Sequence, residues 1–73
     1  MTTTAEWVSA YAKAAGISPP SQDDIDILLQ LAGVAAHASE RTAAPITCWI
    51  AATAGLAPAP ALALAESMAL DAS

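Results

Sequence analysis

A chain of 73 residues has room for one domain, and we expect residues 1–73 to form a single helical domain near the lower size limit for a self-sufficient core. That core is thin, because 21 residues are alanine and large aliphatic side chains are few. Seven acidic and two basic residues give a net charge of −5, which argues against binding to nucleic acid or to an anionic membrane surface, since both need clustered Lys and Arg.

The first predicted helix runs from Thr4 to Ala15. Thr3 and Glu6 form the S/T-x-x-E pattern of a capping box just before an apolar stripe, and a glycine follows the last helical residue. Trp7 and Tyr11 stand one turn apart on one face of this helix. We interpret both aromatic residues as core or interface packing and keep them as interface candidates.

The second predicted helix follows a proline-rich connector, "GISPPS", which cannot continue a helix. Ser21 and Asp24 are three residues apart, as in a capping box, and predict a helix from Asp24 to about Ser39. Its apolar residues spread nearly all round, so it should be the central helix. The acidic residues at its start suit the helix dipole, and their spacing lacks the further oxygen ligands of a calcium loop.

The third predicted helix begins at Pro45 and is closed by Gly55. We interpret Cys48 as a small packing residue and Trp49 as a further interface candidate. The expected buried stripe of this helix consists of Ile46, Trp49, Ile50 and Thr53.

The fourth predicted helix is a shorter one and follows Pro58 and Pro60, with Leu62, Ala65 and Ala69 on one side. No strand pattern occurs in the sequence, so the predicted fold is all-α: a small bundle of three to four helices joined by Pro/Gly turns. Because the core is thin, we expect dimerisation or docking on a partner to complete it, and we predict a homo-oligomer.

Residues 42–65 carry no charge, but three prolines and a glycine divide them into pieces too short to cross a bilayer. The first residues lack the pattern of a signal peptide, and Cys48 has no partner for an internal disulfide. We therefore expect a cytoplasmic location without a membrane span.

The chain's only histidine and one of its two basic residues lie close together, as His37, Glu40 and Arg41. At the end of the second helix they would occupy neighbouring positions on one face. Our first interpretation is a structural corner with Pro45 and Thr47, in which the Glu40 and Arg41 side chains bond to exposed backbone groups and fix the angle to the third helix.

The same three residues allow other interpretations. A metal site needs three or four ligands, and no other His or suitable Cys accompanies His37 and Glu40, so we predict no metal and no cofactor in the monomer. Two copies in a dimer could double the number of ligands, and that case stays open. His37 lacks an assignable nucleophile, so we do not expect catalysis by this chain alone. Recognition of an anion or a partner by Arg41 stays open, as does a small anionic-ligand binder or minimal enzyme with a His37, Glu40 and Arg41 pocket.

The run "LLQLAGVAAHASERTAAPITCWIAATAG", Leu28 to Gly55, resembles the core of a small actinobacterial helical domain family of unknown function. Trp7 on the first helix also fits this family, and Thr42 departs from it, standing where the family has a proline. The matching motif residues are Ala36, His37, Glu40, Arg41, Ala44, Pro45, Ile46 and Thr47.

Members of that family occur alone or attached to molybdenum-cofactor guanylyltransferases, the enzymes of molybdopterin-guanine dinucleotide synthesis. The resemblance therefore implies an association with molybdenum-cofactor biosynthesis and a guanylyltransferase as the protein partner. Our leading hypothesis is a non-catalytic accessory or interaction module.

Overall fold

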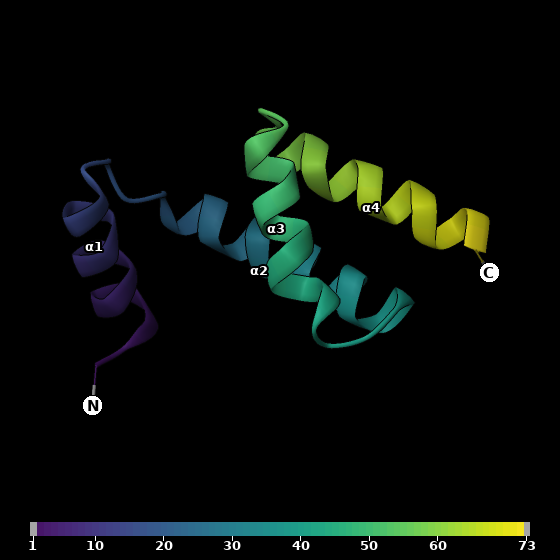
Figure 1. Ribbon diagram of the computed structural model, residues 1–73, viewed down its shortest axis with the longest axis horizontal. Helices are drawn as coiled ribbons and strands as arrows, with labels where there is room; N and C mark the ends of the chain where they lie inside the picture. The colour runs from purple at the N-terminus through teal and green to yellow at the C-terminus, as the bar shows by residue number, and fades with distance from the viewer. Residues whose placement is uncertain (1, 73) are drawn as a thin grey trace.

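The computed structural model describes residues 2–72, with side chains up to residue 70, and these residues confirm an all-α fold without strands. The four helices are α1 (Thr4–Ala15), α2 (Gln22–Ala38), α3 (Ala43–Thr53) and α4 (Pro58–Ala72). Helix α2 packs against both α3 and α4, whereas α1 stands to one side, joined by its connector (Figure 1). Within residues 2–72, no helix has both the length and the apolar character that a bilayer crossing requires.

Helix α1 has the predicted bounds and the predicted caps. The backbone N–H of Glu6 donates to Thr3 Oγ1 at 3.1 Å, and the Glu6 carboxylate accepts from the Thr3 backbone, so the capping box is complete. Gly16 has φ 80°, the left-handed conformation that glycine adopts without strain. Local signals alone therefore account for both ends of this helix.

Helix α2 begins two residues earlier than predicted. Ser21 Oγ accepts from the backbone N–H of Asp24 at 3.1 Å, which makes Ser21 the N-cap and places the first helical residue at Gln22. The Gln22 side chain then donates to Asp26 Oδ1, one turn further on, at 2.9 Å. The serine fixes the start of the helix, as expected, and Asp23 and Asp24 lie in the first turn.

All three prolines of α3 and α4 lie inside the helices, whereas the sequence predicted Pro45 as the first residue of its helix and the fourth helix only after Pro58 and Pro60. Helix α3 starts two residues before Pro45, and α4 starts at Pro58 with Pro60 in its first turn. The first amides of a helix have no acceptor within the helix, so a proline there removes no hydrogen bond. The prediction of a short fourth helix was therefore wrong: α4 has 15 residues, against 12 in α1 and 11 in α3.

The core lies where α3 and α4 meet α2. Leu31 is completely buried, and Ala51 and Ala61 pack beside it from α3 and α4. Partly buried residues surround this cluster: Leu28, Cys48, Leu56, Leu62 and Ala65. The packing role predicted for Cys48 is thus confirmed.

The predicted buried stripe of α3 was wrong. Ile46, Trp49 and Ile50 are 59%, 68% and 55% exposed, and Thr53 is exposed as well. The face that packs on α2 instead presents Ala51, with Cys48 beside it. A small residue at the contact lets two helices approach closely, and the large side chains are then left on the outer face.

Candidate functional site

The corner between α2 and α3 is closed by main-chain hydrogen bonds. The backbone N–H of Ala43 donates to the carbonyl of Glu40 at 2.9 Å, and that of Ala44 donates to the carbonyl of Arg41 at 3.2 Å. Thr42 precedes α3 without a side-chain capping bond. The turn therefore uses the backbone of Glu40 and Arg41 to satisfy the first amides of α3.

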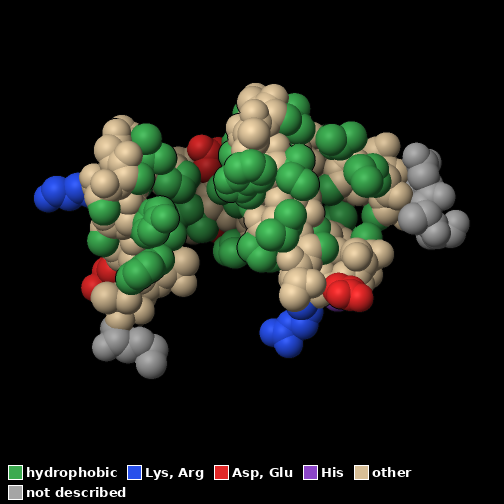
Figure 2. Space-filling view, viewed as in Figure 1, with side chains coloured by type: hydrophobic (Ala, Val, Ile, Leu, Met, Phe, Trp, Pro, Cys, Tyr) green, Lys and Arg blue, Asp and Glu red, His purple; other side chains and the backbone are tan. Residues whose placement is uncertain are grey.

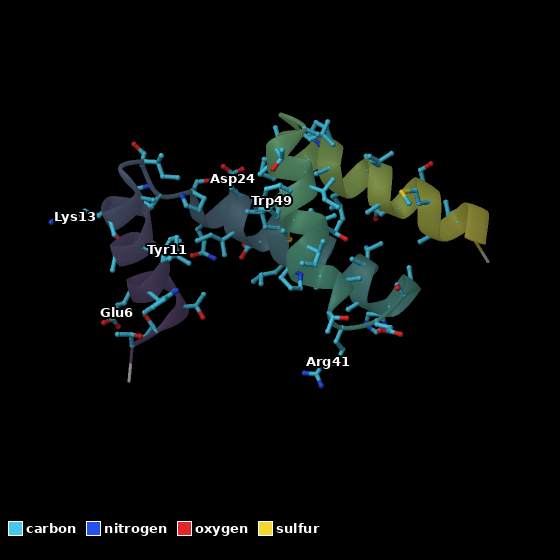
Figure 3. All side chains as sticks on the ribbon, in the orientation of Figure 1. Glu6, Tyr11, Lys13, Asp24, Arg41 and Trp49 are labelled. Carbon is cyan, nitrogen blue, oxygen red and sulfur yellow. The ribbon has the colours of Figure 1, made fainter. Side chains whose placement is uncertain are left out.

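The side chains of His37, Glu40 and Arg41 are all exposed, and the structure records no hydrogen bond or ion pair for them among the described residues. Figure 3 shows the Arg41 guanidinium pointing away from the helices. The expectation that the Glu40 and Arg41 side chains bond to the backbone of the turn was wrong. Exposed backbone groups there reach one another directly, so the side chains are not needed.

His37 lies apart from its two sequence neighbours. Its side chain lines a depression of about 670 Å³ between α2 and α4, together with Gln30 and Glu66. Glu40 and Arg41 do not contribute to this depression. The three residues therefore share no pocket, and the carboxylate that does face the hollow with His37 disfavours an anionic ligand.

Pro45 and Thr47, the other predicted members of the corner, lie in different surroundings. Pro45 is exposed in the first turn of α3, whereas Thr47 is half-buried and faces an apolar groove of about 260 Å³ between α3 and α4. Leu31 lies in this groove, and Ile50, Leu64 and Met68 line it as well. The groove is completed by Ala51, Ala54, Leu56, Ala61 and Ala65.

The three aromatic interface candidates are all on the surface. Trp7 and Tyr11 are 61% and 65% exposed, with ring centroids 6.3 Å apart and planes tilted by 35°. Trp49 is 68% exposed on α3. The view in Figure 2 shows hydrophobic side chains gathered on both α1 and α3, with a recess between the two helices.

No group of three or more His, Cys, Asp and Glu side chains that could hold a metal ion occurs among the described residues. Cys48, the single cysteine of the sequence, is partly buried against the core. Partial burial raises the pKa of Cys48 above its ordinary value of 9.0, because desolvation disfavours the thiolate. A thiol in this state is suited to packing rather than to nucleophilic attack.

The part that α4 plays in both hollows was not predicted from the sequence. Glu66 faces the depression of His37, and Leu64 and Met68 line the apolar groove. The four-residue spacing of Leu64 and Met68 is a signal of a shared helix face. The spacing does not predict the groove, because the groove forms only when α3 and α4 both pack on α2.

Comparison with known proteins gives one positive result. No curated protein and no solved structure matches the chain. The model of one family, described as a domain of unknown function, DUF6457, matches residues 1–72. The chain therefore belongs to the DUF6457 family of domains of unknown function.

Proposed function

We propose that this chain is a non-catalytic interaction module that binds another protein through the apolar groove between α3 and α4. The observation that supports the proposal is the groove itself, which is lined by Leu31 at the core and by three large, exposed side chains, Ile50, Leu64 and Met68. An apolar groove of this kind accommodates the hydrophobic side of a partner's amphipathic helix. The groove-lining residues carry no charge, so desolvating them on binding is favourable.

The partner that we propose is a molybdenum-cofactor guanylyltransferase, with the module acting in molybdopterin-guanine dinucleotide biosynthesis in the cytoplasm. The support for this finer assignment is the resemblance of residues 28–55 to domains that occur alone or attached to such enzymes.

The test is a calorimetric titration of the purified chain into the guanylyltransferase encoded in the same genome. Met68→Ser should weaken binding about tenfold or more, because a large apolar contact in the groove is lost. Leu29→Ser is the matched control, since it removes a similarly exposed side chain from α2, outside the groove. Absence of binding, or equal binding by the wild type and Met68→Ser, would contradict the proposal.

A second measurement addresses the non-catalytic role. Guanylyltransferase activity is compared for the enzyme alone, the chain alone and the mixture of both. We expect turnover only where the enzyme is present, and a changed rate in the mixture. Turnover by the chain alone would overturn the proposal of an accessory role.

A further inference from the structure

The chain exposes more surface than its mass requires. Its accessible surface is 5456 Å², whereas a compact protein of 7.3 kDa exposes about 4,200 Å². The radius of gyration is 12.9 Å, against about 11.2 Å for a compact chain of this length. An excess of about 1,300 Å² per chain is thus available to be covered.

Helix α1 lies to one side of the other three helices (Figure 1). The helix pairs with extensive contacts in the described structure are α2 with α3 and α2 with α4, so the aromatic side of α1 is left uncovered, although Ala12 of this helix is buried. Trp7 and Tyr11 lie on that side and are each more than three-fifths exposed. Two large aromatic side chains on an isolated helix are costly to leave in water.

The connector holds α1 away from the other helices of its own chain. The backbone N–H of Ile17 donates to the carbonyl of Ala12 at 3.0 Å, and Ile17 and Pro20 line a hollow with Tyr11. Pro19 and Pro20 then restrict the backbone on the way to α2. Helix α1 and its connector therefore form one unit that does not fold back onto α3.

The charges of α1 lie away from its aromatic side. In Figure 3, Glu6 and Lys13 project from the outer side of α1, whereas Tyr11 is on the side toward α3. Helix α3 contains no charged residue, and its outer face presents Ile46 and Trp49. The aromatic side of α1 and the outer face of α3 can therefore meet another apolar surface without burying a charge.

We infer that a second copy of this chain covers these two surfaces, in a twofold dimer where α1 of each copy packs against the outer face of α3 of the other. Twofold symmetry requires a self-complementary surface, and one chain supplies both halves of the contact. Covering the excess on two chains would bury about 2,600 Å², which is within the range of stable homodimers. The inference goes beyond the proposed function, because Trp7, Tyr11 and Trp49 do not line the partner groove, which borders the outer face of α3 only at Ile50.

The test is sedimentation equilibrium of the full chain, without any partner protein, over a wide range of concentrations. We expect a reversible dimer. Trp7→Ser and Trp49→Ser should each raise the dissociation constant about tenfold or more, because each removes a large aromatic contact. Met68→Ser is the matched control: its side chain is 63% exposed on α4, outside the dimer contact, and it should leave the constant unchanged.

Three results would overturn the inference. These are a monomer at every concentration, a dimer broken by Met68→Ser, or a dimer that survives both tryptophan substitutions. Circular dichroism verifies that each variant keeps its helices, and Tyr11→Ser serves as a second α1 variant if Trp7→Ser loses them. The guanylyltransferase is absent from this experiment. A failure to dimerise is therefore distinguished from a failure to bind the partner, which calorimetry measures.

Salt supplies an independent readout. Each chain carries a net charge of −5, so two copies repel each other, and added salt screens this repulsion. The dimer dissociation constant should therefore fall as the sodium chloride concentration rises. A dimer held by ion pairs would show the opposite trend and would overturn the apolar contact proposed here.

Discussion

Helices α1 and α3 are nearly equal in length, and each exposes a tryptophan, yet they owe their stability to different causes. Helix α1 has a complete capping box, an acidic residue in its first turn and a basic one in its last, but it packs against no other helix extensively. Helix α3 lacks a side-chain N-cap and any charge in its terminal turns, but it packs on α2 through Ala51. The first is stabilised by local signals and the second by tertiary contacts.

This difference matters because short helices are only marginally stable on their own in water. Helix α1 should open easily unless another surface covers it, whereas α3 should unfold only together with α2 and α4. Low local stability is a common property of segments that bind partners. The contrast therefore agrees with a contact role for the aromatic side of α1.

The largest loss of stability should come from Leu31→Ala, which removes the side chain on which α3 packs. Leu31 is the completely buried side chain at the contact of α2, α3 and α4, so its truncation should lower the free energy of unfolding by about 2–5 kcal/mol. The measurement is urea unfolding followed by circular dichroism. Leu29→Ala, on the same helix but 61% exposed, is the matched control and should cost far less. Equal losses in the two variants would contradict the described core.

A smaller effect, confined to α1, should follow Thr3→Ala. Loss of the capping bonds should destabilise this helix by about 1 kcal/mol. Amide hydrogen exchange should accelerate within α1 and stay constant around Leu31. Thr2→Ala is the control, since Thr2 takes no part in the capping box. Faster exchange around Leu31 in Thr3→Ala would show that α1 and the other helices open together, and the contrast drawn above would be lost.

The smallest expected effect is a shift in the pH dependence of labelling at Cys48, which packs against the core of α2, α3 and α4. Its pKa is raised by burial, so iodoacetamide labelling should reach its half-maximal rate above pH 9.0 in the native chain. Below pH 9.0 the protonated thiol contributes its full stabilisation, and this is lost as the pH rises through the raised pKa. Labelling in urea, where the thiol is solvated, is the control. A native midpoint at or below that of the unfolded chain would contradict the packing role.

Much of the helical pattern could be predicted from the sequence, because helix ends depend on neighbouring residues. Thr3 and Glu6 predict the start of α1, and the glycine after Ala15 predicts its end. Ser21 likewise marks the start of α2. The errors at Pro45 and Pro58 arose because a proline is accepted anywhere in a first turn, so it does not identify the first residue.

The candidate site was less predictable. His37, Glu40 and Arg41 are neighbours in the sequence, but the end of α2 and the following turn send their side chains to different surroundings. The depression beside Glu66 and the groove beside Met68 both depend on the position of α4 against the other helices. Residues distant in the sequence complete both hollows, and helical spacing within one segment carries no information about them.

The sequence by itself determined the helical segments and both ends of α1, because caps and glycines act through the backbone of a few adjacent residues. The tertiary structure alone decided which side of each helix is buried. Size suggested that Trp49 and Ile50 would be inside, but the close approach of α3 and α4 to Leu31 selected Ala51 and Ala61. Packing density between helices, rather than the hydrophobicity of single residues, therefore determined the core and left the large side chains on the surface.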